Sequence, residues 1–375
     1  MTTEPIPALD DAVRMQAIDK RNMLRLINEL PEQCETALGI ARSFAVEPSE
    51  TSPGSVFITG VGDSGIAADM AAAALADVSD VPVISDHGGR LPKYVGEGSL
   101  VFIVDYTGKS KTAMRNLRDA KVRGAQVICI ATGGQLLESA AKEEVRTIKI
   151  PPGQPGRTAI GYLLVPIMAV IEKFGITQGQ VEQLSHGIKL MKNVREMLRF
   201  ETPTARNAAK QAAEALYGRV VGIYSGPGYQ LAVADRWKSQ IAANGKAIAF
   251  SGLLRALAFG EISGWETSGK RADELAIVLL RDPADKGELV ELADACAEVM
   301  KDFRVVQISM RGASTIEKLF YGIYLGDYIS YYLALLAEMD PSVTENIARV
   351  EAMLAEPVEP PAPVEQAEQI EAGGE

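Results

Sequence analysis

The stretch Ser55–Asp69, SVFITGVGDSGIAAD, constrains the fold of this chain more than any other. A β-branched apolar run ending at Gly60 predicts a buried strand, and the alanine-rich residues after Gly65 predict a helix. Between them, Gly62 and Ser64 are small enough to let backbone N–H groups face an anion at the helix N-terminus. The glycines also fit the dinucleotide pattern G-x-G-x-x-G, so the turn alone leaves open a phosphate, a dinucleotide or an ordinary strand-to-helix turn.

Apolar runs alternate with helical stretches through most of the chain, which predicts parallel sheets covered by helices. The strands expected in a first lobe are Val56–Thr59, Val83–Ser85, Leu100–Asp105, Val127–Ala131 and Arg146–Ile150. Those expected in a second lobe are Val220–Tyr224, Ala247–Phe250, Leu275–Leu280 and Val305–Ile308. Ligands of such α/β sheets bind beyond the carboxyl ends of the strands. We therefore expect the binding site at the turn that begins at Gly60.

These patterns predict an α/β protein with two lobes. The expected parts are N-terminal helices and a linker (1–52), a first lobe (53–175), a helical connector (176–215), a second lobe with C-terminal helices (216–355) and an acidic tail (356–375). Within the first part, helical spacing over Asp11–Phe44 predicts two helices with a break at Pro31. The tail is rich in proline and glutamate and lacks aromatic residues, so we expect it to be disordered.

A second loop that follows a predicted strand is Asp105–Thr112, DYTGKSKT. It offers three hydroxyl groups and two ammonium groups, and Gly108 permits a close approach of the backbone. Because the loop opens a helix, its N–H groups and charges favour an anion. The ordinary alternative is a helix N-cap. Two such loops at strand ends of one sheet favour a ligand site.

Composition excludes several classes of function. The chain has 38 Lys and Arg against 49 Asp and Glu, a net charge of -11, and no basic block, so we expect no nucleic-acid partner. Its three cysteines lack C-x-x-C spacing, which indicates buried thiols in a reducing compartment rather than zinc ligands. Neither a leader pattern nor a membrane-spanning apolar run is evident. We expect a cytoplasmic protein with no cofactor and no metal.

The two loops together resemble the sugar isomerase (SIS) domain, in which a Gly-Ser turn and a Ser/Thr-rich loop cradle a sugar phosphate. The resemblance implies phosphate or sugar binding by Gly62, Ser64, Thr107, Lys109, Ser110 and Thr112. The segment PGQPGRTAIGY, Pro152–Tyr162, resembles bacterial and archaeal bifunctional phosphoglucose/phosphomannose isomerases, with Arg157 at their active-site arginine. ADRWKSQ, EISGWE and YLGDYISYYLALL in the second lobe match the same family. This implies two flavodoxin-like SIS lobes, a homodimer and aldose–ketose isomerisation of hexose 6-phosphates.

Isomerisation requires a base that moves a proton between C1 and C2, a group that opens the sugar ring, and a positive charge that stabilises the enediolate. Arg157 suits the last role. The family's glutamate base corresponds to Ala243, and its ring-opening histidine corresponds to Phe259. Glu261 is the other catalytic candidate, because it belongs to the matched EISGWE segment; Lys246 is a further one.

The phosphate loop also departs from the family. Its first serine is Asp105 here, and Lys109 replaces an asparagine. A carboxylate beside a phosphate is repulsive unless a lysine neutralises it. Asp63, in place of a glycine, adds a second negative charge near the first turn.

Three hypotheses follow from the sequence. The first is an isomerase with rearranged catalytic groups. The second is a non-catalytic SIS protein, a sugar-phosphate sensor or partner subunit. The third is a nucleotide-binding Rossmann-like enzyme, in which Asp86 at the end of the second strand would bind a ribose.

Overall fold

The computed structural model describes residues 9–46 and 52–355. The chain divides into two compact units, Met1–Ser342 and Val343–Glu375. The first contains both sheets, and the second contains helix α15 (Glu345–Ala355). The acidic tail lies outside the described residues.

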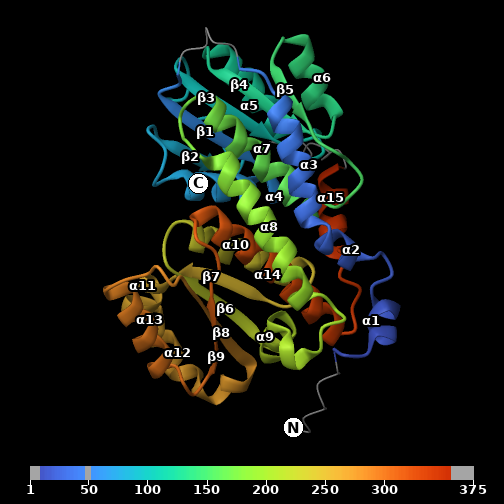
Figure 1. Cartoon of the computed structure of the whole chain (residues 1–375), viewed down its shortest axis with the longest axis vertical. Helices are drawn as coiled ribbons and strands as arrows, with labels where there is room; N and C mark the ends of the chain where they lie inside the picture. Colours follow the sequence, from blue (N-terminus) through green and yellow to red (C-terminus); the bar gives the residue numbers. More distant parts are fainter. Residues whose placement is uncertain (1–8, 47–51, 356–375) are drawn as a thin grey trace, which may run out of the picture. The chain divides into compact units, whose positions relative to one another are not determined.

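A five-stranded parallel sheet confirms the first predicted lobe (Figure 1). Its strands are β1 (Ser55–Gly60), β2 (Val83–Asp86), β3 (Ser99–Val104), β4 (Gln126–Ala131) and β5 (Arg146–Lys149). Each predicted strand is confirmed to within one residue at either end, because these apolar runs are long and bounded by turn residues. Strand β3 is buried along its whole length, as expected for a parallel strand covered on both faces.

The order β2-β1-β3-β4-β5 fixes where a ligand can bind. The chain leaves β1 towards β2 on one side and returns to β3 on the other. The loops after β1 and β3 therefore diverge and leave a crevice at the carboxyl edge of the sheet. Both predicted ligand loops lie at this point.

The second sheet repeats the same topology with four parallel strands in the order β7-β6-β8-β9. They are β6 (Val220–Ser225), β7 (Ala249–Leu253), β8 (Leu275–Arg281) and β9 (Arg304–Ser309). Strand β7 extends three residues beyond its predicted end at Phe250. Ser251 and Gly252 have low strand propensity, but Gly252 packs closely against the Tyr224 ring, where an added Cβ would lie 3.1 Å from Cε1. Tertiary packing thus overrides local preference.

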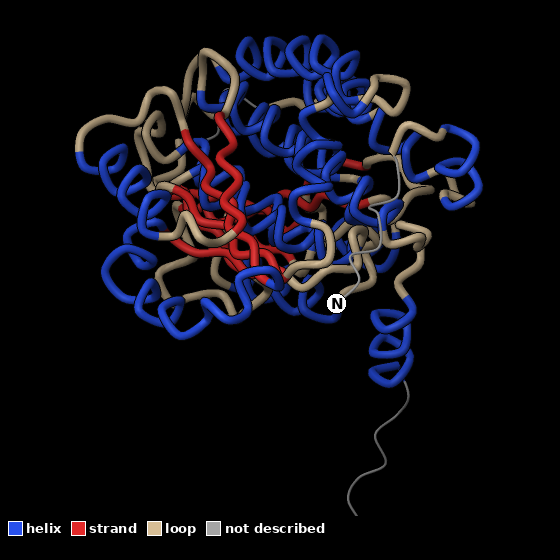
Figure 2. Tube along the Cα trace, turned by 90° about the horizontal axis from the view of Figure 1, so that it is seen from below, coloured by secondary structure: helices blue, strands red, loops and turns tan. Residues whose placement is uncertain are grey.

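Helices cover the strands, which lie in the interior (Figure 2). The α-helices of the first unit are α1 (Ala12–Ile18), α2 (Met23–Asn28), α3 (Leu30–Ser43), α4 (Asp63–Leu75), α5 (Lys111–Val122), α6 (Gly134–Lys142), α7 (Ile160–Lys173), α8 (Gln180–Leu198), α9 (Ala208–Leu216), α10 (Tyr229–Ala243), α11 (Leu254–Ala256), α12 (Ile262–Glu266), α13 (Glu288–Val299) and α14 (Thr315–Leu336). Shorter turns are the 3-10 helices η1 (Gly156–Thr158), η2 (Thr204–Arg206) and η4 (Thr267–Glu274) and the π-helical turn η3 (Leu257–Glu261).

One continuous apolar core joins the inner faces of both sheets. It includes residues of β1 and β6 together with α3, α4, α7, α8, α10 and α14. Two smaller clusters cover the outer faces, one under α5 and α6 and the other under α11 and α13. Helix α4 of the first lobe packs directly against α10 of the second. The shared core thereby fixes the relative position of the two lobes.

The break predicted at Pro31 lies two residues earlier, at Glu29, which separates the end of α2 at Asn28 from the start of α3 at Leu30. Pro31 lies in the first turn of α3, where a proline costs little because its missing N–H would have no helical partner. A further break, which the sequence analysis did not predict, lies between α1 and α2. There Asn22 adopts a left-handed φ of 56°, and the buried Asp19 carboxylate accepts the N–H groups of Met23 (2.7 Å) and Leu24 (3.0 Å).

Candidate functional site

The turn between β1 and α4 needs glycine for close packing and for its backbone angles. A Cβ on Gly60 would lie 2.6 Å from the carbonyl carbon of Ser64, and Gly62 has φ +59°. Ser64 is 4% exposed, and its hydroxyl accepts the backbone N–H of Tyr106 at 3.3 Å. This hydrogen bond joins the two predicted ligand loops.

Asp105 organises the second loop from within. Its carboxylate accepts the N–H of Ser110 at 2.7 Å and the hydroxyl of Thr107 at 3.2 Å. The Thr107 oxygen in turn accepts the N–H of Lys109 at 3.3 Å. The carboxylate that departs from the family pattern is therefore committed to the loop's own donors, which reduces its repulsion of a bound anion.

Several donors at the start of α5 remain available. Ser110 caps the helix by accepting the N–H of Ala113, and within the described chain its hydroxyl donates to no residue. The Thr112 hydroxyl has no hydrogen-bond partner among the described residues. Lys109 and Lys111 are exposed and form no ion pair with any of them. Gly60, Val61, Gly88, Ser110, Thr112 and Asn116 are among the residues that line a small hollow between the loops.

The loop after β2 lies at the same carboxyl edge of the first sheet. His87 contacts the Asp69 carboxylate of α4 at 2.5 Å, and its ring crosses α4 at Gly65, where a Cβ would lie 2.8 Å from Nδ1. Asp86, the residue expected to bind a ribose in the nucleotide hypothesis, accepts the N–H of Gly89 at 2.6 Å. Its carboxylate is thus engaged within its own loop.

Arg157 reaches across from the first lobe to the second. It lies in η1, between β5 and α7, and its Nε donates to Oδ1 of Asn244 at 2.8 Å. Its Nη2 donates to the carbonyls of Pro341 (3.3 Å) and Ser342 (3.1 Å). Among the described residues Nη1 has no acceptor, so the guanidinium is held in position with one nitrogen still available.

A buried ion pair contacts the backbone of Arg157. The fully buried Arg236 of α10 donates from Nη2 to both carboxylate oxygens of Asp327 on α14, at 2.8 Å each, and to the Arg157 carbonyl at 3.1 Å. Burial lowers the pKa of Arg157, and the negative charges of Asp63 and Asp340 oppose this. Arg236 belongs to the ADRWKSQ segment that resembles the family, but the sequence alone did not indicate its role. The position of Arg236 on the apolar side of α10 was the sequence feature that could have predicted a buried ion pair.

The second-lobe candidates lie in two different places. Ala243 ends α10 next to Asn244, and its carbonyl accepts the Lys246 ammonium at 2.5 Å. Phe259 lies in η3 and is 73% exposed. Glu261 is also exposed, and its carboxylate accepts the Tyr224 hydroxyl at 2.7 Å. The structure therefore brings position 243 to Arg157. In the described chain, Glu261 has no part in the hydrogen bonds around Arg157.

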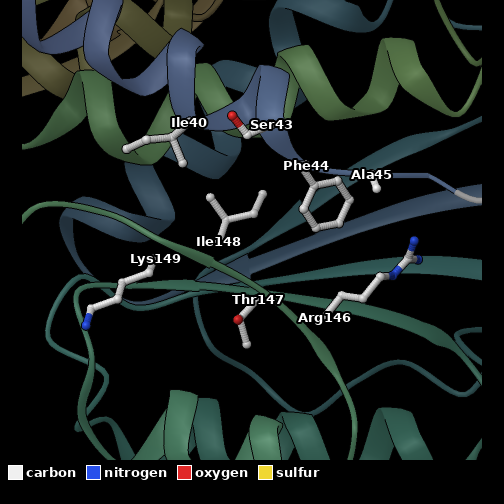
Figure 3. Close-up of a pocket in the computed structure, with 8 residues that line it drawn as sticks. All are labelled: Ile40, Ser43, Phe44, Ala45, Arg146, Thr147, Ile148 and Lys149. Carbon is white, nitrogen blue, oxygen red and sulfur yellow. The ribbon is translucent and has the colours of Figure 1, made fainter.

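A larger hollow lies at the edge of the first sheet, between the end of α3 and β5 (Figure 3). Its volume is about 450 Å³. It is lined by Ile40, Ser43, Phe44, Ala45, Arg146, Thr147, Ile148 and Lys149. The Arg146 guanidinium lies over the Phe44 ring, 5.5 Å from its centroid. None of the site residues predicted from the sequence lines this hollow, so the candidate site is the crevice at the carboxyl edge.

Comparison with protein families identifies the class of both lobes. The SIS domain matches residues 51–173, and the bacterial phospho-glucose isomerase C-terminal SIS domain matches residues 205–354. The fold is shared with a glucose-6-phosphate isomerase-like protein from Thermus thermophilus (TM-score 0.60, 21% identity, 90% of this chain and 98% of that one). It is also shared with tagatose-6-phosphate ketose/aldose isomerase from Escherichia coli (TM-score 0.62, 14% identity, 91% and 98%). The chain is a protein of two SIS domains.

Curated relatives narrow this class. The bifunctional phosphoglucose/phosphomannose isomerase of Caldicellulosiruptor bescii is 32% identical over 89% of this chain and 99% of its own length. The protein of the same name from Aquifex aeolicus is 28% identical over 80% and 90%. The chain belongs to the family of bifunctional phosphoglucose/phosphomannose isomerases. Among the described helices, none combines the length and apolar character that a membrane crossing requires.

Proposed function

We propose that this protein binds a hexose 6-phosphate at the carboxyl edge of the first sheet. The phosphate would lie on the loop Asp105–Thr112 and the sugar would extend towards Arg157. The observation that carries the proposal is the set of uncommitted donors at the N-terminus of α5, above all the Ser110 and Thr112 hydroxyls beside the hollow. Donors without protein acceptors at a helix N-terminus favour a dianionic ligand. The names of the relatives supply the class of sugar phosphate.

Ligand-induced stabilisation tests this proposal. Glucose, mannose and fructose 6-phosphates are each added to the full chain, with unphosphorylated glucose as the control ligand. We expect at least one sugar phosphate to raise the melting temperature in proportion to ln(1 + [L]/Kd), and glucose to leave it unchanged. The proposal is wrong if none of the three raises it.

A matched pair of variants locates the phosphate. Thr112→Val keeps the methyl group, which would lie 3.1 Å from a Cβ on Gly88, but removes the uncommitted hydroxyl. Loss of a hydrogen bond to a charged group should weaken binding by about tenfold or more. Thr36→Val is the control, because the Thr36 hydroxyl bonds to the Glu32 carbonyl of its own helix. Equal affinities for the two variants would place the phosphate elsewhere.

A non-catalytic sugar-phosphate sensor or partner subunit is the second candidate function. It is favoured by Ala243 and Phe259, which replace the residues that the family resemblance assigns to proton transfer and ring opening. Coupled assays with the same three sugar phosphates distinguish it from an isomerase. Binding without turnover of any of them supports the sensor.

We also infer a homodimer in the cytoplasm. Ile248 (72%) and Phe259 (73%) are strongly exposed on the second lobe, near the edge strand β7 and on η3. Burial of such side chains favours association. Light scattering should give twice the 40.2 kDa chain mass, whereas 40.2 kDa would contradict the dimer. The free, buried Cys34, Cys129 and Cys296 agree with a reducing compartment.

A further inference from the structure

Asp63 has a position that the family pattern does not explain. It is the first residue of α4, directly after the glycine turn, and it is half-buried. Its Oδ2 lies 3.1 Å from the point where a Cβ on Gly156 would be. Gly156 is the neighbour of Arg157. The carboxylate therefore faces the loop that carries the arginine, which is the sugar end of the proposed site and not the phosphate loop.

The carboxylate is also uncommitted. Within the described chain it accepts no hydrogen bond and forms no ion pair. The charged groups that face it are Arg157 of η1, Arg236 of α10 and Asp327 of α14. Arg236 donates its Nη2 to Asp327, and its buried Nε and Nη1 have no acceptor among the described residues. Two arginines and one aspartate thus act on a carboxylate that accepts no hydrogen bond from the described residues.

Asp63 of the first lobe and Ala243 of the second lobe both lie near the Arg157 segment. Ala243 adjoins Asn244, whose side chain accepts the Arg157 Nε from the second lobe. Asp63 approaches the same arginine from the first lobe. A sugar held beside Arg157 would therefore meet a carboxylate from the first lobe, where the family places one on the second.

The other candidate bases are engaged in hydrogen bonds. Lys246 donates to the Ala243 carbonyl. Asp340 accepts the N–H of Ser342 at 2.8 Å. Glu261 accepts the Tyr224 hydroxyl, away from this cluster. Of these carboxylates, Asp63 alone lacks a hydrogen bond within the described chain.

We propose that Asp63 is the base that moves the proton between C1 and C2 of the bound sugar, replacing the glutamate that is missing at position 243. This inference rests on the proposed function, because it requires a hexose 6-phosphate in the site. It makes the protein an active isomerase rather than a sensor.

The reaction balances without an oxidant or a cofactor. The Asp63 carboxylate removes the C2 proton of the open-chain aldose, and the C2–H electron pair forms the C1–C2 double bond. The π pair of C1=O1 moves onto O1, whose negative charge Arg157 would stabilise. The O2 proton then passes to O1, C2=O2 forms, and the C1–C2 double-bond pair takes the proton from Asp63 at C1.

The environment of Asp63 suits this role. Burial raises the pKa of its carboxyl group, and the charges of Arg236 and Arg157 only partly offset the effect. A raised pKa makes the ionised carboxylate a stronger base near neutral pH. The acid limb of kcat/KM should therefore follow Asp63.

The test uses the full chain with fructose 6-phosphate. We expect the wild type to form aldose and to incorporate solvent deuterium at C1 in D2O, measured by NMR. Asp63→Asn should lower kcat by at least about 100-fold, as for loss of a general base, with KM changed less than threefold. Asp63→Glu should retain activity with a displaced acid limb. The control is Asp77→Asn, an exposed aspartate just beyond α4, which should match the wild type.

Each outcome decides the inference. An Asp63→Asn rate within threefold of the wild type overturns it. A wild type that binds fructose 6-phosphate but neither isomerises it nor exchanges deuterium also overturns it, while the proposed binding function stands. Failure of all three sugar phosphates to bind overturns both. If Asp63→Asn does not fold, Asp63→Gly restores the family's residue at this position and serves in its place, with the same rate criterion.

Discussion

The crevices of the two sheets have the same topology, but one carries uncommitted hydroxyl groups and the other an internal ion pair. In the first sheet, the loops after β1 and β3 leave the Ser110 and Thr112 hydroxyls uncommitted beside a hollow. In the second, the corresponding loops follow β6 and β8, and an internal ion pair lies beside them. There Asp282 pairs with the buried Lys318 ammonium, at 2.7 Å from Oδ1, and contacts the Tyr229 hydroxyl. An internal carboxylate occupies the place that an anionic ligand would take.

The difference shows that the SIS topology supplies a crevice, while side chains determine whether it binds a ligand. Burial acts to raise the pKa of Asp282, but the hydrogen bonds from Lys318 and Tyr229 outweigh it and hold the pKa below its ordinary value. The internal ion pair thus stabilises the fold at neutral pH. In the first crevice, Asp105 has no ammonium partner among the described residues, and its carboxylate is committed to its own loop.

The largest effect should come from opening the closed crevice. Lys318→Met leaves Asp282 buried without its cation, which should lower the unfolding free energy by about 3 to 5 kcal/mol. Urea unfolding measures the loss, and fructose 6-phosphate affinity should remain unchanged in the folded protein. A loss below about 1 kcal/mol would mean that the pair does not stabilise the second lobe.

Removing the hydrogen bond that joins the two ligand loops should have an intermediate effect on stability. Ser64→Ala removes the acceptor of the Tyr106 N–H, which should cost about 1 to 3 kcal/mol and weaken sugar-phosphate binding. Ser225→Ala, at the end of β6, is the comparison change in the second lobe; among the described residues its hydroxyl donates to the adjacent Gly226 carbonyl alone. It should cost less and leave binding unchanged. Equal losses in both variants would contradict a special role for the loop link.

The raised pKa of Asp63 should make the stability of the protein depend on pH. Because its pKa is higher in the folded than in the unfolded chain, the folded state holds the extra proton between the two values, and stability falls as pH rises through them. Asp63→Asn should therefore raise the melting temperature at pH 8 relative to the wild type. The difference should vanish below about pH 4, the unfolded value. A lower melting temperature at pH 8 would show that its charge stabilises the fold.

The smallest stability effect should come from the exposed lysines of the open crevice. The double change Lys109→Ala and Lys111→Ala should alter the unfolding free energy by less than about 0.5 kcal/mol. Affinity for fructose 6-phosphate should fall and lose part of its salt dependence. Lys121→Ala, at the other end of α5, should change neither quantity. An unchanged affinity in the double variant would show that these lysines do not contribute to phosphate binding.

The sequence by itself determined the α/β class, the first sheet and the candidate loops. Long apolar runs bounded by glycine turns specify buried parallel strands, and Gly60 and Gly62 have geometric requirements that can be read locally. The family match also pointed to Arg157 and to the absences at Ala243 and Phe259. These features depend on residues close together in the chain.

Only the tertiary structure decided how charges from distant segments meet. Asp63 reads as an extra negative charge near a phosphate, yet α4 turns it towards Gly156 and Arg157. Asp105 reads as repulsive, but loop closure gives it the Ser110 N–H. The strength and sign of an electrostatic effect depend on burial and on partners through space. Neither the burial of a charge nor its partners can be read from sequence spacing, because both arise only when the two lobes pack around their common core.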